Sequence, residues 1–282
     1  MRILVTGASS PLAARVVNDL LRITDAEIWC ARHKREVNIS DPRVRIVELD
    51  LESDDGLASI DHVHFDQVVH FAGVTHSDDE DRYWKVNLEG TMRLAKLVRD
   101  NGCRRFVFIS TRCATAGSGA YGESKLAAER QLQQFDWTSL LVIRPAEVYG
   151  ADSTEGLDRM LRLARHWHVV PAFWGNSGIR FAPIHVDDFS ACAAAAIKDH
   201  AKGFSIVEAS GPEELSGISL AGRIMRRYAA VPVPIWWPGF SLAVSSLRNL
   251  GMKLATPDQL NRLVSKKTAR SGRNADMVRF LK

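Results

Sequence analysis

The fold is decided by the stretch Ile3-Leu4-Val5-Thr6-Gly7-Ala8-Ser9-Ser10-Pro11-Leu12-Ala13, which runs from an apolar β-type segment into a helix start. Beyond it, Leu12, Val16 and Leu20 place one apolar stripe along the helix. A helix start presents unpaired N–H groups and the positive end of the helix dipole, which suit a pyrophosphate. The stretch therefore predicts a strand, a phosphate-binding loop and a helix in succession.

The loop has the GxxGxxG spacing, but only Gly7 of its three positions is glycine, and Ser10 and Ala13 stand at the other two. Gly7 allows a tight turn, the Ser10 hydroxyl can donate a hydrogen bond, and Ala13 is small enough for close helix packing. A simple strand-to-helix turn with Pro11 at the first helical position is the alternative. The residues predicted to contact a dinucleotide here are Gly7, Ser9, Ser10, Pro11 and Leu12.

Short β-rich runs alternate with amphipathic helical segments through the first half of the chain, which is the pattern of a parallel sheet covered by helices on both faces. Strands are predicted at Ile3–Val5, Glu27–Ala31, Val44–Leu49, Gln67–Phe71, Arg105–Ser110 and Ser139–Arg144, with helices centred on Leu57, Leu94 and Ala128. A helix at Ala191–Ile197 and a strand at Phe204–Glu208 indicate a late return to the sheet. We predict an α/β fold with a Rossmann-type doubly wound parallel sheet.

The alternation weakens beyond Gly150, and the segment from Gly211 onward is expected to be mostly helical, with Pro232, Pro234 and Pro238 breaking it. We expect residues 1–150, with a return segment at about 183–209, to form a dinucleotide-binding Rossmann domain. Residues 151–182 and 210–282 are expected to form a smaller, mostly helical substrate-binding lobe.

The chain has 282 residues, 46% hydrophobic and 25% charged, with a formal net charge of +4, which excludes disorder, collagen and coiled coil. The small charge argues against a nucleic-acid partner, and no apolar run approaches the ~20 residues of a membrane span. The four cysteines show no metal-ligand spacing, so we predict no metal site and reduced thiols. Because Met1-Arg2 leads directly into a strand, without a secretory leader, we expect a cytoplasmic protein.

Two segments bear on the adenosine end of a dinucleotide. Asp50-Leu51 ends the third strand, where a carboxylate can accept a hydrogen bond from an adenine amino group or cap the next helix. Arg32, Lys34 and Arg35 follow the second strand, where NAD enzymes usually have an acidic residue for the ribose hydroxyls. Cations there favour a 2′-phosphate, although a solvated basic loop is the alternative. We predict NADP or NAD as cofactor, with NADP slightly favoured.

Tyr121 and Lys125 lie four residues apart, on one face of a predicted helix. A free phenol has a pKa near ~10, but a neighbouring ammonium and an oxidised nicotinamide would both lower that pKa. Ser110-Thr111, at the end of a strand ten residues upstream, supplies hydroxyls that can hold a substrate oxygen. We predict that Thr111, Tyr121 and Lys125 form a proton-relay site for hydride transfer. A packed tyrosine beside a solvated lysine is the alternative.

In order along the chain, these motifs resemble the extended short-chain dehydrogenase/reductase family, which includes nucleotide-sugar epimerases, dehydratases and keto-reductases. The resemblance covers nearly the whole length and rests on the Gly-rich loop, Asp50-Leu51, His70–Gly73, Tyr83–Thr91, Phe108–Thr111, the Tyr121/Lys125 pair, Arg144–Gly150 and Ile184–Asp188. It implies that Tyr121 is the general acid/base, that Lys125 binds the nicotinamide ribose and that Thr111 orients the reacting oxygen. It also implies cofactor contacts from Arg32, Asp50, Leu51, Phe71, Ala72, Gly73, Asn87, Ser110, Pro145 and Val148.

Departures from the family pattern bear on the substrate. Family 4,6-dehydratases have an Asp-Glu pair after the catalytic Thr, whereas Thr111 is followed by Arg112-Cys113, so dehydration is not expected. Glu147 replaces the Asn common in the epimerases, and must turn away from a diphosphate, pair with a cation or signal a different substrate. Arg180 is similar in position to the family's diphosphate-binding Arg. The predicted substrate contacts are Thr75, Thr111, Glu147 and Arg180.

The resemblance implies NAD(P)-dependent hydride transfer at a secondary alcohol or ketone of a nucleotide sugar, by a 4-epimerase or a 4-keto-reductase. Glu147 and the apolar C-terminal lobe suggest an alternative, an NADPH-dependent reductase of a non-sugar ketone. A non-catalytic dinucleotide-sensing protein is a further alternative, and the intact Thr111, Tyr121 and Lys125 argue against it. Helices carrying the catalytic Tyr often pair in this family, so a homodimer is expected.

Overall fold

The main sheet is built from parallel strands. A computed structural model describes the chain except for residues 54, 152–155, 200–201, 250–255, 266 and 268–282. Within it, seven strands lie in the order β11-β6-β5-β4-β1-β2-β3. Their bounds are β1 Arg2–Thr6, β2 Glu27–Arg32, β3 Val44–Glu48, β4 Gln67–His70, β5 Arg105–Ile109, β6 Ser139–Pro145 and β11 Gly203–Ala209. The chain leaves β1 first for β2 and β3 and later returns to its other side as β4, so the strand order reverses beside the carboxyl end of β1.

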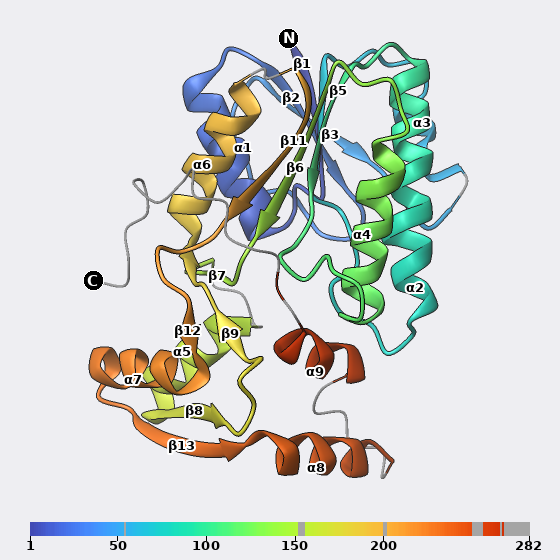
Figure 1. Ribbon diagram of the computed structural model, residues 1–282. Helices are drawn as coiled ribbons and strands as arrows, with labels where there is room; N and C mark the ends of the chain where they lie inside the picture. The colour runs from blue at the N-terminus through green and yellow to red at the C-terminus, as the bar shows by residue number, and fades with distance from the viewer. Residues whose placement is uncertain (54, 152–155, 200–201, 250–255, 266, 268–282) are drawn as a thin grey trace.

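Helices cover both faces of this sheet (Figure 1). One layer holds α1 (Pro11–Ile23) and α6 (Val186–Lys198), and the other holds α3 (Thr91–Asp100) and α4 (Ala120–Leu132). Before α3, the helix begins as α2 (Asp81–Tyr83) and continues through a π-helical segment, η2 (Trp84–Gly90). The predicted Rossmann-type sheet is confirmed.

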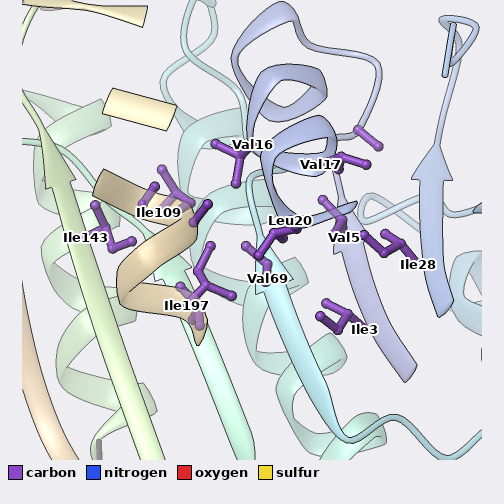
Figure 2. Packing of buried hydrophobic residues seen from close by; sticks show 14 of the residues in the cluster. Ile3, Val5, Val16, Val17, Leu20, Ile28, Val69, Ile109, Ile143 and Ile197 are labelled. Atoms are coloured by element: carbon purple, nitrogen blue, oxygen red, sulfur yellow. The ribbon is translucent and has the colours of Figure 1, made fainter. Parts of the chain in front are cut away.

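Two-residue periodicity in the strands divides the core between the two layers. Ile3 and Val5 of β1 point toward α1, where they meet Val16 and Leu20 (Figure 2). Leu4 lies between them in sequence and points to the opposite face, toward the α3 and α4 layer. Because both faces are buried, the strand is apolar at consecutive positions rather than alternating with polar residues.

A smaller group of elements lies beyond the carboxyl ends of the sheet strands (Figure 1) and has its own hydrophobic core. Its elements are β7 Val148–Tyr149, α5 Gly156–Trp167, β8 Val169–Trp174, β9 Arg180–Phe181, β10 Ile184–His185, β12 Leu215–Ser216, α7 Gly217–Tyr228, β13 Val231–Trp236, α8 Trp237–Asn249 and α9 Pro257–Val264. Short pairs connect them: β7 with β10, β9 with β12, and β8 with β13.

Two sequence predictions about local structure were wrong. The helix centred on Leu57 is a short 3-10 helix, η1 (Asp55–Ile60). Two of the three prolines expected to break a helix, Pro232 and Pro234, lie in strand β13, which pairs in parallel with β8, and Pro238 is the second residue of α8. Val231 N–H donates to His168 O (2.7 Å), so the alternate residues Pro232 and Pro234 direct their nitrogens to the outer edge. Proline is tolerated there because an edge strand makes no hydrogen bond on that side.

Helices α1, α3, α4 and α6 match the predicted helical segments, and β11 matches the predicted return strand. In the part of the chain that the structure describes, every helix is too short or too polar to cross a lipid bilayer.

Candidate active site

The loop between β1 and α1 is pressed against the end of β4. Gly7 has a φ of +67°, and a Cβ at this position would lie 2.7 Å from Ala72 N. Both observations require glycine, because other residues are strained at this φ and the space is already filled by backbone. Ser10 caps α1 by accepting a bond from Ala13 N (3.2 Å), and Pro11 takes the first helical position. The cap uses a lone pair of Ser10 Oγ, so its hydrogen can still be donated.

A buried chain of hydrogen bonds ties this loop to β4 and η2. Thr91 Oγ1 donates to Asn87 O (2.8 Å), so His70 Nε2 must donate to Thr91 Oγ1 (2.9 Å). Burial, followed by the charge of Lys125, lowers the pKa of His70 well below its usual value, so the ring is neutral and Nδ1 is an acceptor. Thr6 Oγ1 therefore donates to His70 Nδ1 (2.7 Å). These bonds fix one tautomer of His70 and connect β1, β4, η2 and α3.

Asn87 and Gly73 shape the surface above the catalytic helix. The Asn87 side chain accepts from Val74 N (2.8 Å) and donates to Val74 O (3.0 Å), which holds the chain after β4. A Cβ on the exposed Gly73 would lie 2.8 Å from Asn87 Oδ1 and 3.2 Å from Lys125 Nζ. This glycine therefore leaves a shallow cradle directly over Lys125, where a ligand can approach the backbone closely.

Thr111, Tyr121 and Lys125 are brought together at the end of β5 and the start of α4. Thr111 and Tyr121 are each 9% exposed, and Lys125 is 3% exposed. A hydrogen bond from Thr111 acts to lower the pKa of Tyr121. Lys125 Nζ donates to Ile109 O (3.1 Å) and lies 4.6 Å from the centre of the Phe108 ring. The three predicted residues thus form one buried cluster.

The ionisation of this cluster differs from the sequence expectation. Burial raises the pKa of Tyr121 to about 12, and the largest lowering influence is the charge of Arg262 rather than of Lys125. Burial also lowers the pKa of Lys125 to about 8, while the carboxylate of Glu129 acts to raise it. The difference arises because the Lys125 ammonium is directed to a backbone carbonyl. Sequence reasoning had expected this neighbouring ammonium to lower the pKa of the phenol.

Sequence reasoning missed two residues at this site, both on the C-terminal helix α9. Asp258 Oδ1 accepts a bond from Tyr121 N (3.0 Å). The Arg262 guanidinium lies 4.5 Å from the centre of the Tyr121 ring. The capping box of Thr256 and Gln259 is a sequence signal that could have marked the start of this helix, but the sequence carries no signal for where the helix docks.

A buried network of ion pairs and hydrogen bonds joins α4 to the neighbouring strands of the sheet. Glu129 accepts two bonds from Arg144, from Nε (2.9 Å) and Nη2 (2.5 Å). Arg144 Nη1 also lies 3.5 Å from Glu208 Oε1. Ser110, a predicted cofactor contact, donates its hydroxyl hydrogen to Glu129. The network therefore commits Ser110 Oγ–H to the protein and joins α4 to β5, β6 and β11.

Arg32, predicted to contact a 2′-phosphate, forms ion pairs within the protein. Its guanidinium contacts Glu36 and also Glu48 (2.9 Å from Nη2 to Oε1). Lys34 and Arg35 are exposed beside it. Two carboxylates thus offset the charge that the sequence assigned to a phosphate, because the acidic partners lie on the loop and on the neighbouring strand β3.

Asp50 and Leu51 are also engaged by the protein. Asp50 Oδ1 accepts from Glu52 N (2.8 Å), and Asp50 Oδ2 lies 3.7 Å from His33 Nε2. The bond from Glu52 N closes a local turn and does not cap the next helical element, η1, which begins only at Asp55. Leu51 is buried, and its carbonyl accepts a bond from Arg93. One Asp50 oxygen therefore closes a turn.

The residues predicted to contact substrate are dispersed. Glu147 Oε2 accepts from Ala182 N (2.8 Å), so this carboxylate holds the chain after β9, one of the outcomes expected if it turns away from a diphosphate. Arg180 is exposed on β9, opposite Ser216 of β12. Thr75 lies nearer the tyrosine, since its carbonyl accepts from Arg262 Nη2 (2.9 Å).

Pro145 and Val148, two of the predicted cofactor contacts, lie at the junction with the smaller group of elements. Pro145 O accepts from Arg112 N (3.1 Å), and Val148 pairs with Ile184 where β7 meets β10. Phe71 N donates to Thr6 O (3.2 Å), which places Phe71 at the phosphate loop. The predicted residues at the carboxyl ends of β1, β4 and β5 thus gather around one edge of the sheet.

Comparisons with known proteins agree with this geometry. A model of the NAD dependent epimerase/dehydratase family matches residues 3–207. A ceramide reductase from Caulobacter vibrioides is 33% identical over 124 residues, covering 44% of this chain and 38% of that protein. A UDP-glucose 4-epimerase from Vibrio cholerae is 34% identical over 121 residues, covering 34% of this chain and 37% of that protein. The matched stretches thus span less than two fifths of these relatives.

A solved structure has the same fold. MoeE5 in complex with UDP-glucose and NAD superposes with a TM-score of 0.71 at 19% sequence identity, and the match covers 84% of this chain and 85% of that one. At this identity the similarity establishes the fold of the chain, and its chemistry has to be argued from its own side chains.

Proposed function

The chain belongs to the NAD-dependent epimerase/dehydratase family, and from this premise we propose that it is an extended short-chain dehydrogenase/reductase enzyme. Its reaction is hydride transfer between a nicotinamide dinucleotide and a secondary alcohol or ketone. The substrate is a nucleotide sugar, on which the enzyme acts as a 4-epimerase or a 4-keto-reductase.

The observation that carries this proposal is the buried cluster of Thr111, Tyr121 and Lys125 beneath the glycine cradle. A dinucleotide fits the residues around it, because Gly7 and Gly73 both lack a Cβ where one would fill the approach, and the start of α1 favours a pyrophosphate. Gly7, Ser10 and Gly73 would hold the group, and the buried Asn87 would keep the chain after β4 in place beneath it. When bound, a nicotinamide supplies the carbon that accepts or returns hydride.

The side chains of this chain perform the proton transfer. Tyr121 Oη takes the proton of the substrate hydroxyl when the carbinol is oxidised, or returns it when the ketone is reduced. Thr111 beside it donates a hydrogen bond that stabilises the phenolate. The Lys125 ammonium below Gly73 adds positive charge and is the group placed to bind a ribose hydroxyl. An epimerase would require the keto sugar to rotate before it is reduced again.

A second candidate is the NADPH-dependent reductase of a non-sugar ketone. The ceramide reductase from Caulobacter vibrioides supports it by similarity, and suggests a ketone on a lipid. Glu147 supports it as well, because the position where family epimerases carry a sugar-contacting Asn is used here to hold Ala182 N. A lipid ketone has no diphosphate, and the dispersed Arg180 would then have no role in binding it.

For the cofactor, we propose NAD or NADP. Lys34 and Arg35 are exposed and favour the 2′-phosphate of NADP, whereas the two carboxylates on Arg32 oppose it. Paired dissociation constants for NADH and NADPH decide between them. We also propose the division into a Rossmann domain and a substrate lobe, a cytoplasmic location and a homodimer, the last of which light scattering tests.

The test of function is a panel of UDP-sugars and of ceramides that carry a ketone, each with NADH or NADPH. Absorbance at 340 nm follows the cofactor, and chromatography follows the product. Epimers formed without net cofactor oxidation identify a 4-epimerase, and stoichiometric loss of the reduced cofactor identifies a reductase, for whichever substrate is consumed. Tyr121→Phe should abolish turnover and retain cofactor binding. If the chain's function survives this substitution, the proton relay is refuted and a dinucleotide sensor is favoured.

A further inference from the structure

The C-terminal helix α9 packs against the N-terminal turn of the catalytic helix α4, far from it in sequence (Figure 1). The side chains of Asp258 and Arg262, one helical turn apart on α9, are 2% and 15% exposed. Arg262 Nε lies 2.9 Å from Asp258 Oδ2, so the two side chains form one buried ion pair. Both face Tyr121.

Asp258 supplies the cap that α4 lacks. The residue before the helix is Gly119, which has a φ of +93° and no side chain to accept a bond. Asp258 Oδ1 accepts from Tyr121 N instead, and a Cβ on Gly119 would lie 2.6 Å from that oxygen. Orphan N–H groups at a helix start are normally satisfied by a neighbouring residue in the sequence. Here the acceptor comes from 137 residues away.

Arg262 places a cation against the phenol. Its guanidinium lies 4.5 Å from the centre of the Tyr121 ring, and Nη2 donates to Thr75 O (2.9 Å). Asp258 and Thr75 together fix the orientation of this side chain, so the charge is held in place rather than mobile. Lys125 directs its own ammonium to Ile109 O. The cation in contact with the phenol ring is therefore Arg262.

Several other groups face Tyr121. They are Thr111 and Cys113 from the loop after β5 and Tyr83 from α2; Lys267 donates to Cys113 Sγ (3.2 Å), and Lys125 donates to Ile109 O. Burial has the largest effect on the pKa of Tyr121 and raises it. The charge of Arg262 has the largest lowering effect on the same pKa. Asp258 acts in the opposite direction, since its carboxylate raises the same pKa.

We propose that Arg262, seated by Asp258, is a positioning residue that stabilises the phenolate of Tyr121 during proton transfer, so that helix α9 completes the active site. This inference rests on the proposed function for its role in turnover. The electrostatic effect itself needs neither cofactor nor substrate.

The experiment titrates Tyr121 directly. The chain has four tyrosines, so global incorporation of 3,5-difluorotyrosine, whose phenol ionises at lower pH than tyrosine, gives four fluorine signals, and Tyr121→Phe identifies one of them. Arg262→Gln should move the midpoint of the Tyr121 signal upward by about one to three pH units. Arg262→Lys should restore most of the shift. Asp258→Asn keeps an oxygen for the Tyr121 N–H but removes the carboxylate that holds Arg262, so a further Arg262→Gln substitution should shift the midpoint less in this background than in the unmodified chain.

Arg130→Gln is the matched control, because it removes an exposed arginine from α4, the helix that carries Tyr121. The Tyr121 midpoint of this variant should equal that of the unmodified chain. The proposal is overturned if Arg262→Gln leaves the midpoint unchanged, or if it shifts the midpoint equally with and without Asp258→Asn. Should Arg262→Gln fail to fold, as loss of the other three signals would show, Arg262→Met decides in its place: an upward shift supports the proposal and no shift overturns it.

The same variants serve once a substrate is known. The acidic limb of the kcat/KM profile should move with the fluorine midpoint in Arg262→Gln, and Arg262→Lys should return it. A substrate panel without turnover would count against the proposed function and would leave the titration result standing. Conversely, if the enzyme is active and Arg262→Gln leaves the Tyr121 midpoint unchanged, the proposed role of α9 is refuted and the proposed function is not.

Discussion

Lys125 should cost the folded protein stability, and the cost should depend on pH. Burial lowers the pKa of this ammonium from 10.5 to about 8. The folded state therefore binds fewer protons than the unfolded state between these values, so stability rises with pH across this window and the full cost is present below pH 8. Each pKa unit corresponds to about 1.4 kcal/mol, which puts the cost near 3 kcal/mol at pH 7 and near 1 kcal/mol at pH 10.

The substitution Lys125→Met removes this cost while keeping an unbranched chain in the same space. It also removes the bond to Ile109 O, worth about 1 kcal/mol, which the neutral amine makes as well. The contact of the ammonium with the Phe108 ring acts only on the charged form, so the shifted pKa already includes it. At pH 7 the variant should therefore be more stable by about 2 kcal/mol, and at pH 10 the two proteins should have similar stability, because the remaining cost and the lost bond are both about 1 kcal/mol.

Urea unfolding followed by tryptophan fluorescence measures this difference at pH 7 and at pH 10. Lys96→Met is the matched control, because Lys96 is exposed on α3 and its substitution should give the same difference at both pH values. A Lys125→Met difference that stays constant between pH 7 and pH 10 would refute the conclusion that Lys125 is a desolvated cation.

Two further substitutions test the scaffold. Gly7→Ala should destabilise the fold by more than about 2 kcal/mol and weaken dinucleotide binding, because it adds a Cβ against Ala72 N to the strain of a positive φ. Gly203→Ala is the control, because Gly203 has a φ of +82° but open space around it, so this substitution should cost only the backbone strain of about 1–2 kcal/mol in the same urea assay. Equal losses of stability in the two variants would contradict a steric clash at Gly7. Glu129→Gln should cost about 3 kcal/mol in urea unfolding, because the buried Arg144 keeps only the longer contact to Glu208; a cost below about 1 kcal/mol would be inconsistent with the network.

What the sequence predicts well is local. The β1 to α1 transition follows from an apolar run, one obligatory glycine and Pro11 at a helix start, all within a dozen residues. The Tyr121 and Lys125 pair follows from helical spacing. Each of these features is determined by neighbours in the chain, so pattern and propensity are sufficient.

What the sequence does not predict is set by distant contacts. Pro232 and Pro234 are poor strand residues, and only the partner β8 shows that their nitrogens face an open edge. Asp258 looks like an ordinary first-turn acid of α9, and its bond to Tyr121 N depends on how that helix docks. Arg32 was assigned to a phosphate because it stands in a basic cluster after the second strand, yet Glu36 and Glu48 both contact its guanidinium.

The pairing of β8 with β13 has a consequence for biosynthesis. These strands are separated by some sixty residues, and α9, which caps the catalytic helix, comes later still. A chain emerging from the ribosome can assemble β1 to β6 while the acceptor for Tyr121 N has yet to be translated. Nascent molecules should therefore form the sheet first, and Tyr121 N should gain its acceptor only after α9 has been translated.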